Sequence, residues 1–416
     1  PLYSSAASDV YKRQSVPPLM RVQAAAGARC AAPHARPLSR EQVVGRKAKW
    51  VGMVVLLLGA AGAGGALALS HEAPCADTAA QGPTASDTTG ARMYRYHCYG
   101  GPEVLRLEAI TTPTPADTEV LVRVRAASVN PLDWHYLRGK PYVMRVESGI
   151  GAPKEERIGA DFAGTIEAVG ARVTQFKVGD RVFGTRTGAF ATHVLVREGG
   201  TIARMPDSTS FEQAAAVGVA ATTALQAIRD QAQVREGQRV LINGASGGVG
   251  TYAVQIAKIY GAQVTAVAST RNLAMVQELG ADRVIDYTTT DFTKGAERYD
   301  VIIDMVGNHG ARALDAVLAP GGRAVMVGGP NGNAYLGPIT HLAMAMVQAP
   351  VLSGTFIPFI STSSKTDLVT LRDWMQRGTL RSVIDREFAF AELAAAVAYQ
   401  EAGRSRGKVI VQMPMP

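Results

Sequence analysis

Residues 240–250 read Val-Leu-Ile-Asn-Gly-Ala-Ser-Gly-Gly-Val-Gly, and this stretch decides the fold. An apolar strand over residues 240–242 runs into a glycine turn, and we expect a helix over 251–260 and a second strand over 264–268. Glycines in such a turn let the backbone approach a pyrophosphate, and the helix N-terminus offers it free N–H groups. The sequence therefore predicts dinucleotide binding here. Because Ala245 stands at the first glycine of G-x-G-x-x-G, a tight turn that binds no ligand is the alternative.

Strands and helices continue to alternate after this turn, over residues 272–327. This alternation is typical of an α/β fold with a doubly wound parallel sheet of the Rossmann type, whose crossovers are right-handed. Ligands of such sheets bind at the carboxyl ends of the strands. We therefore expect Ser269, Gly307 and Gly328 to lie at the binding site.

The residues that follow the second strand indicate which dinucleotide binds. An NAD site usually holds an acidic residue about twenty residues beyond the glycine motif, where it binds the ribose 2′-hydroxyl. Here Ser269-Thr270-Arg271 occupies that place, and no acid occurs between Val264 and Met275. Two hydroxyls and a guanidinium would bind a 2′-phosphate, which a carboxylate would repel. We therefore expect NADPH as the cofactor rather than NADH.

Short strands at close spacing precede this region. We expect them over residues 93–99, 104–110, 119–127, 163–169 and 181–184, separated by glycine-containing turns. Such spacing is typical of an antiparallel, barrel-like domain rather than of strand–helix–strand units. The chain has 416 residues, of which 47% are hydrophobic and 19% charged, so it can form two or three domains of an ordinary globular enzyme.

Three further motifs occur in order before the glycine turn: Ser128-Val-Asn-Pro-Leu-Asp-Trp134, the segment 159–170 that begins Gly159-Ala-Asp161, and Phe176-Lys-Val-Gly-Asp-Arg-Val-Phe-Gly184. With the glycine turn, they closely resemble the medium-chain dehydrogenase/reductase superfamily, in its zinc-independent quinone oxidoreductase branch. The resemblance covers about residues 93–416. It implies a GroES-like, barrel-like β-rich catalytic domain, formed by residues 93–218 and 357–416, and a Rossmann NADPH-binding domain of residues 219–356.

The same resemblance bears on metal binding. Zinc-dependent members of the superfamily hold a catalytic zinc through a cysteine and through a histidine in a Gly-His-Glu segment. The matching places here read Asn130-Pro131 and Gly159-Ala160-Asp161, and the four-cysteine structural zinc lobe is missing. Since zinc sites depend on thiolate or imidazole ligands, we expect no metal at this site.

Four side chains are the expected catalytic or substrate-binding groups. In quinone reductases, the asparagine that matches Asn130 borders the substrate and the nicotinamide, where its amide could donate to an oxygen that gains negative charge. Asn130 and Asp133 are expected on a loop after a strand, and turn chemistry is the alternative explanation of Asn130-Pro131. Tyr136 is expected to line the pocket, and Thr223 matches a threonine that relatives place near the nicotinamide.

The resemblance implies hydride transfer from NADPH to a small molecule, namely a quinone or an α,β-unsaturated carbonyl. Two alternatives stay open: a zinc-independent alcohol or aldehyde dehydrogenase, and a non-catalytic NADPH-binding structural or regulatory protein. In relatives, strands that match residues 351–360 pair across a dimer, so we expect a homodimer and a substrate contact from Phe356. The expected cofactor contacts are Ala245, Ser246, Gly247, Gly248, Val249, Gly250, Ser269, Thr270, Arg271, Tyr287, Gly307 and Gly328.

We expect the first 92 residues to be a leader outside the folded core, with residues 70–92 as a linker. The first 92 residues supply about +5 of the net charge of +8, so the remainder has a mixed surface that gives no reason to expect nucleic-acid binding. Residues 50–69 form an uncharged apolar run long enough to span a membrane. A signal peptide and mis-assigned upstream sequence, with the functional protein beginning near Met93, are the other interpretations. We expect a cytoplasmic enzyme, because NADPH would be scarce across a membrane, with a membrane anchor through residues 50–69 as the alternative.

Three cysteines occur in the chain, Cys30, Cys75 and Cys98. They are scattered, and no two lie close in sequence. We therefore expect neither a disulfide framework nor a cysteine-based zinc site.

Overall fold

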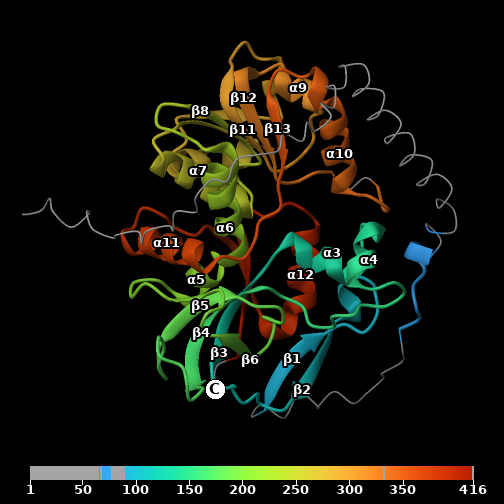
Figure 1. Ribbon diagram of the computed structural model, residues 1–416, viewed down its shortest axis with the longest axis vertical. Coiled ribbons are helices and arrows are strands. Elements are labelled where there is room, and N and C mark those ends of the chain that lie inside the picture. The colour runs from blue at the N-terminus through green and yellow to red at the C-terminus, as the bar shows by residue number, and fades with distance from the viewer. Residues whose placement is uncertain (1–64, 66–67, 76–89, 331–332, 415–416) are drawn as a thin grey trace, which may run out of the picture. The chain divides into compact units, whose positions relative to one another are not determined.

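A computed structural model describes residue 65 and residues 68–75, 90–330 and 333–414 of the chain (Figure 1). The predicted apolar run of residues 50–69 lies for the most part outside these residues. Among the helices of the described residues, none has both the length and the apolar character that a membrane crossing requires.

Within the described residues, a six-stranded parallel sheet contains the glycine turn. Its strand order is β10-β9-β8-β11-β12-β13, and every neighbouring pair is parallel. The order runs outward from β8 in both directions, which confirms the predicted doubly wound arrangement. The strands are β8 (Arg239–Asn243), β9 (Gln263–Ala268), β10 (Arg283–Asp286), β11 (Tyr299–Asp304), β12 (Leu318–Met326) and β13 (Thr355–Pro358).

Helices cover both faces of this sheet. Val240 and Ile242 of β8 pack into one core with α6 and α7, whereas Leu241 belongs to a second core with α9 and α10. Figure 1 shows α7 and α10 on opposite sides of the sheet. Because both faces are buried, the centre of β8, residues 240–242, is a continuous apolar run rather than an alternating one. The helices are α3 (Pro131–Arg138), α4 (Arg145–Ser148), α5 (Phe211–Ala215), α6 (Gly218–Gln226), α7 (Gly248–Ile259), α8 (Leu273–Glu278), α9 (Ala311–Asp315), α10 (Pro338–Gln348), α11 (Lys365–Gln376) and α12 (Leu393–Glu401).

A second, mainly antiparallel sheet forms the β-rich domain. Its order is β14-β15-β3-β4-β5-β7, with β6 paired to β3, and a separate hairpin joins β1 to β2. The last strand, β15, pairs with β3 and so returns the chain end to this domain. The strands are β1 (Ala91–Arg95), β2 (Arg106–Ile110), β3 (Glu119–Val129), β4 (Asp161–Val169), β5 (Arg181–Thr185), β6 (His193–Arg197), β7 (Ile202–Arg204), β14 (Ile384–Ala389) and β15 (Lys408–Gln412).

The structure differs from the prediction in two helices. Asn130 and Asp133, predicted on a loop, lie at the start of α3, where Asn130 is the N-cap and Pro131 the first helical residue. The carboxylate of Asp133 accepts a hydrogen bond from the Asn130 backbone N–H at 2.7 Å, which satisfies a donor that the helix leaves free. Helix α10 occupies residues 338–348, for which the sequence analysis predicts no element, whereas the strand expected within residues 351–360 is present as β13.

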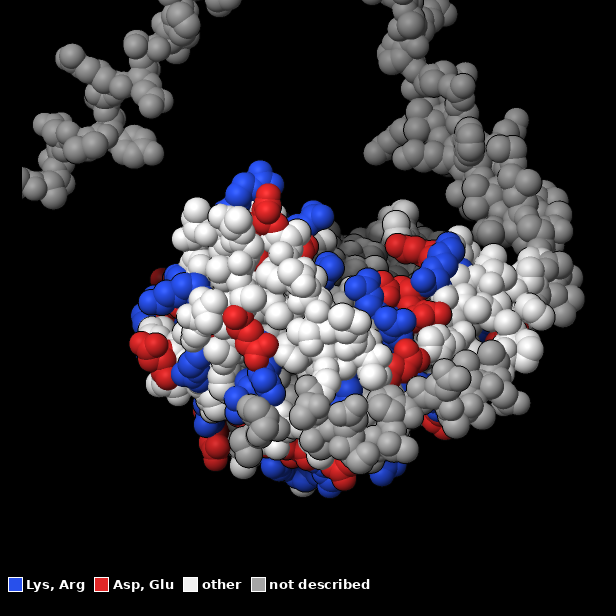
Figure 2. Space-filling view, turned by 90° about the horizontal axis from the view of Figure 1, so that it is seen from below, with Lys and Arg blue, Asp and Glu red and all other residues white. Residues whose placement is uncertain are grey.

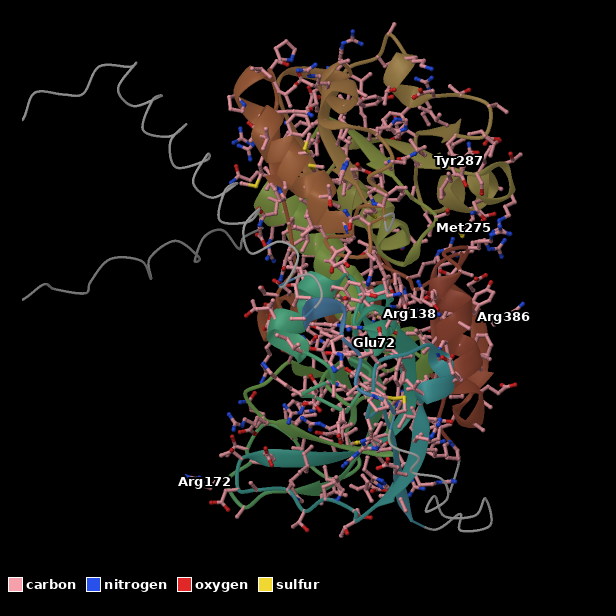
Figure 3. The ribbon with its side chains drawn as sticks, turned by 90° about the vertical axis from the view of Figure 1, so that its right-hand side faces the viewer. Glu72, Arg138, Arg172, Met275, Tyr287 and Arg386 are labelled. Carbon is pink, nitrogen blue, oxygen red and sulfur yellow. A yellow bond between two sulfur atoms is a disulfide. The ribbon has the colours of Figure 1, made fainter. Side chains whose placement is uncertain are left out.

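A short segment before β1, the strap of residues 68–75, is joined to the β-rich domain. A disulfide links Cys75 to Cys98, so the prediction of no disulfide is wrong. The fully buried Arg145 donates to the carbonyls of Leu69 and His71 and pairs with Glu72 at 2.8 Å. Figure 3 labels Glu72 and shows the disulfide. Sequence spacing could not predict the pairing, because the fold alone brings the two cysteines together.

Charged side chains of both signs are interspersed on the surface of the β-rich domain. Figure 2 shows one face, where Lys and Arg alternate with Asp and Glu. Several form ion pairs, such as Arg123 with Glu167 at 3.1 Å and Arg204 with Asp180 at 3.0 Å. Among the described residues visible on this face, basic side chains do not gather into an extended patch of the kind that binds nucleic acid.

Candidate functional site

The glycine turn presents the N-terminus of α7 toward the strand ends. The helix begins at Gly248, three residues earlier than predicted, and its N-cap, Gly247, provides no side-chain cap. A Cβ on Gly250 would lie 2.2 Å from the Gly244 carbonyl oxygen, so only glycine allows this close packing. The uncapped N–H groups and the positive end of the helix dipole fit a pyrophosphate.

A buried amide connects the glycine turn to the end of β9. Asn272 donates from its Nδ2 to the hydroxyl oxygens of Ser246 at 3.1 Å and Ser269 at 3.2 Å. The structure thus brings two predicted cofactor residues together through a third that sequence reasoning missed. An asparagine after Ser-Thr-Arg carries no motif of its own, so only the fold reveals this role.

Thr270 and Arg271 point to different partners. The Thr270 hydroxyl donates to the carboxylate of Asp286 at 2.5 Å, and Arg271 donates to the carbonyl oxygen of Arg404 at 2.9 Å. Asp286 ends β10, and its pKa is held below the ordinary value by hydrogen bonds from Thr270 and Thr288. An acid therefore stands beside the predicted phosphate site after all, supplied by the neighbouring strand rather than by the loop after β9.

The remaining predicted cofactor residues lie at strand ends. The backbone N–H of Gly307, after β11, donates to the buried carboxylate of Asp304 at 3.0 Å. A Cβ on Gly328, after β12, would lie 2.2 Å from the Met305 carbonyl oxygen. Tyr287, after β10, is exposed at the surface, as Figure 3 shows. All three positions follow carboxyl ends of neighbouring strands, where ligands of such sheets bind.

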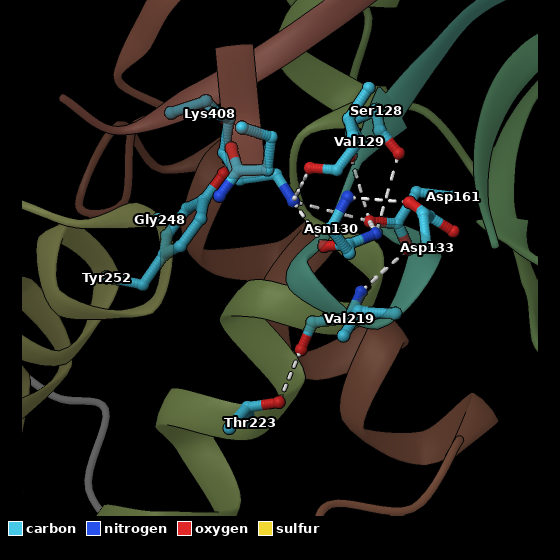
Figure 4. A network of polar contacts seen from close by, with 12 residues as sticks. Ser128, Val129, Asn130, Asp133, Asp161, Val219, Thr223, Gly248, Tyr252 and Lys408 are labelled. Atoms are coloured by element: carbon cyan, nitrogen blue, oxygen red, sulfur yellow. Dashed lines mark hydrogen bonds and ion pairs between the residues drawn. The ribbon is translucent and has the colours of Figure 1, made fainter. Parts of the chain in front are cut away.

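A buried polar network lies between the two domains (Figure 4). Lys408 of β15 donates to the Asn130 Oδ1 atom at 2.6 Å, and its Nζ lies 3.6 Å from the Asp161 carboxylate. The Asn130 amide and the Ser128 hydroxyl each donate to Asp161 at 2.9 Å. The stem of Lys408 also reaches the glycine turn, because a Cβ on Gly248 would lie 3.1 Å from its Cδ atom. The network therefore holds the first turn of α3 against the start of α7.

These contacts engage the Asn130 amide, which the sequence predicts as a donor to the substrate. Its amide hydrogens are directed to Asp161 and, at 3.5 Å, to the carbonyl oxygen of Ser128, while its oxygen accepts from Lys408. Both ends of the amide are thus engaged within the protein, and donation from Asn130 to a substrate oxygen stays a prediction. Lys408 is a member of this network that sequence reasoning missed, since it is 278 residues away from Asn130 in the chain.

Burial sets the protonation of the network. Burial, together with the nearby Asp161 charge, raises the pKa of Asp133 to about 7, against the opposing effects of the Asn130 N–H and of Lys408. Burial also lowers the pKa of Lys408, against the carboxylates of Asp161 and Asp133. The ammonium of Lys408 occupies the neighbourhood of Asn130 and Asp161, which offers zinc neither thiolate nor imidazole. These residues do not fit a catalytic zinc ion.

A cavity of about 350 Å³ opens beside the network. Three of the four predicted catalytic side chains line it, namely Asn130, Asp133 and Tyr136. The fourth, Thr223 of α6, is not among the lining residues, and its hydroxyl bonds to the Val219 carbonyl and the Ser361 hydroxyl, both at 2.7 Å. Further lining residues are Tyr96, Met144, Glu155, Arg157, Ile158 and Val219. A larger hollow of about 570 Å³ lies elsewhere and contains none of the predicted residues.

Two protein families and several known enzymes are similar in sequence to this chain. Residues 116–207 match the alcohol dehydrogenase GroES-like domain, and residues 279–411 match the family described as zinc-binding dehydrogenase. Quinone oxidoreductase of Homo sapiens is 32% identical over 315 residues, which cover 73% of this chain and 92% of that protein. The 2-methylene-furan-3-one reductase of Solanum lycopersicum is 31% identical over 344 residues, which cover 78% of this chain and 79% of that protein.

A solved structure is also similar to this chain. The quinone oxidoreductase of Coxiella burnetii superposes with a TM-score of 0.68 at 29% identity, over 78% of this chain and 99% of that one. The GroES-like match confirms that the β-rich domain is of the predicted type.

Proposed function

Because the chain belongs to the medium-chain dehydrogenase/reductase superfamily, in its quinone oxidoreductase branch, we propose that this oxidoreductase is NADPH-dependent and zinc-free. Its proposed acceptor is a quinone or an α,β-unsaturated carbonyl. The name of the Solanum lycopersicum relative, 2-methylene-furan-3-one reductase, describes an unsaturated ketone of this kind. The observation that carries the proposal is the cavity beside the buried network, which is lined by neither cysteine nor histidine and has Asn130 and Ala160 where zinc enzymes of the superfamily hold their metal.

In such a reaction, different residues would bind the cofactor, fix the site and hold a proton. When bound, NADPH supplies a hydride from C4 of its nicotinamide. The uncapped start of α7 would hold the pyrophosphate, and the network of Lys408, Asn130 and Asp161 would keep that turn fixed against the cavity wall. Asp133 lines the cavity with a pKa raised to about 7, so its carboxyl group can hold a proton for the product near neutral pH.

The preference for NADPH rests on Ser269 and Arg271. Arg271 uses one N–H on the Arg404 carbonyl, and its guanidinium keeps further donors for a 2′-phosphate. The carboxylate of Asp286 favours NADH instead, but its oxygens already accept from Thr270 and Thr288. We therefore keep NADPH as the proposed cofactor, with Ser246, Ser269 and Arg271 at its phosphate end.

The test of the cofactor is a titration of the full chain with NADPH and with NADH, followed by nicotinamide fluorescence. Arg271→Ala should weaken NADPH binding by about tenfold or more, because a hydrogen bond to a charged group is lost, and should leave NADH binding unchanged. Arg283→Ala is the matched control, since Arg283 is an exposed arginine of β10 that pairs with Glu297. Absence of NADPH binding by the wild-type chain would refute the proposal. A panel of quinones, enones and aldehydes then identifies the acceptor.

We also propose a homodimer and a cytoplasmic location. The dimer rests on the free edge of β13, described below. The location rests on the supply of NADPH, and the Cys75–Cys98 disulfide weighs against it, because disulfides persist in oxidising compartments. Mass spectrometry of the native protein, with free thiols alkylated before digestion, would show which state the two cysteines adopt.

A further inference from the structure

One side chain of the cavity wall has a polar group without a protein partner. Tyr96, which follows β1, is 3% exposed and lines the cavity together with Asp133, Tyr136 and Glu155. Among the described residues, none forms a hydrogen bond with its hydroxyl. Buried tyrosine hydroxyls usually find a partner, as that of Tyr99 does on the Gly149 carbonyl at 2.7 Å. The Tyr96 hydroxyl thus faces a space that a ligand can fill.

The surroundings keep this hydroxyl protonated. Burial raises the pKa of Tyr96, and the nearby Tyr99, Glu155, Tyr136 and Asp133 raise it further. A phenol with a raised pKa stays a neutral O–H donor at working pH. The negative charge of Glu155 is balanced by Arg157, whose Nε and Nη2 atoms donate to its carboxylate at 2.7 and 2.6 Å. An oxygen atom that gains negative charge beside Tyr96 would therefore find a hydrogen-bond donor, next to a carboxylate that is already paired. The exposed Glu147 lines the cavity as well.

The cavity extends from Tyr96 to residues of the buried network. Asn130 and Val219 line it as well, and both belong to the network that contacts Asp161. The backbone holds Tyr96 in place, because its N–H donates to the Glu156 carbonyl at 3.0 Å. An acceptor molecule in the cavity can therefore lie between Asn130 and the Tyr96 hydroxyl.

We propose that the Tyr96 hydroxyl is the hydrogen-bond donor for the carbonyl oxygen of the acceptor, an inference that rests on the proposed function. When a hydride adds to the acceptor, the π electron pair moves to this oxygen, which becomes an oxyanion and accepts the hydrogen bond. Tyr96 keeps its proton throughout. The proton that completes the product comes from the Asp133 carboxyl group or from water, so the reaction consumes one hydride and one proton. Such a donor acts more strongly on the transition state than on the ground state.

The test compares Tyr96→Phe with Tyr94→Phe. Tyr94 is also buried, but its ring packs 5.0 Å from Phe390 and it does not line the cavity. The first measurement is binding of 4-nitrophenolate, a stable oxyanion, followed by its absorbance in the full chain. Tyr96→Phe should weaken this binding about tenfold or more, whereas Tyr94→Phe should not change it. NADPH binding should stay the same in both variants.

The second measurement is turnover of the best acceptor. Tyr96→Phe should lower kcat by about 100-fold, as loss of one oxyanion donor does, with Tyr94→Phe near wild type. Wild-type phenolate binding that is undetectable, or unchanged in Tyr96→Phe, would overturn the role of Tyr96 even if turnover occurs. Conversely, phenolate binding that depends on Tyr96 in a chain that turns over no quinone or enone supports the oxyanion site and rejects the proposed function.

Discussion

Asp133 carries a pKa of about 7 because its carboxyl group is buried beside Asp161. Below this pH the group holds a proton that it can give to the product, and above it the proton is lost. We therefore expect kcat for enone reduction to be constant below about pH 7 and to fall about tenfold per unit above it. Steady-state rates at saturating NADPH from pH 5 to 9 measure this profile.

Two variants identify the group behind the profile. Asp133→Asn cannot donate a proton, so its kcat should be low and should show no break near pH 7. Lys408→Gln removes the positive charge that lowers the pKa of Asp133, so the break should move to higher pH. Both variants need thermal unfolding curves beside the rates, because the network is buried. A break that stays at the same pH in both would assign the profile to another group.

The strap is an element whose contribution to stability can be isolated. The Cys75–Cys98 disulfide closes a loop with a sequence separation of 23 residues. Loss of such a cross-link gives the unfolded chain more freedom, so Cys75→Ser should lower the free energy of unfolding by about 3 kcal/mol. Urea unfolding of the oxidised proteins, followed by tryptophan fluorescence, measures the difference.

The third cysteine provides the control. Cys30 lies outside the described residues, and Cys30→Ser should leave the urea midpoint unchanged. A reductant should bring the wild type to the stability of Cys75→Ser and should not affect that variant further. Equal stability of the oxidised wild type and Cys75→Ser would show that the strap adds nothing, despite its contacts with Arg145.

The elements of the nucleotide-binding half follow closely from local sequence, because strand β8, the glycine turn and helix α7 are each encoded by neighbouring residues. The network could not be predicted in the same way. Asn130 and Asp133 are recognisable in the chain, yet Lys408 meets them only because β15 pairs with β3. Tyr96 shows the same limit, since a tyrosine near the end of a strand gives no sign that a cavity lies beside its hydroxyl. Contacts between distant segments therefore separate the predicted site from the observed one.

At the scale of the whole molecule, the nucleotide-binding sheet ends in two edge strands within the described residues, β10 and β13. Strand β13 is the last strand of its sheet, with β12 on one side. Several apolar side chains in α10 and in the residues that follow it lie near β13 and are strongly exposed. Val347 and Val351 are each 73% exposed, and Ile360 is 84% exposed. Exposed strand edges and contiguous apolar surface are typical of association sites. A second copy that pairs with β13 would cover both.

We therefore expect a dimer in solution, measured by light scattering coupled to size-exclusion chromatography. Val347→Asp should shift the protein toward the monomer, because the dimer would have to bury an unpaired carboxylate. Val178→Asp is the matched control, since Val178 is 59% exposed in the turn before β5 of the β-rich domain and should leave the dimer intact. A wild-type monomer at micromolar concentration, or an equal loss of the dimer in both variants, would contradict association through this edge. NADPH binding by the monomeric variant would then show that each copy forms its cofactor site alone, as expected from the single-chain origin of the glycine turn, Ser269 and Arg271.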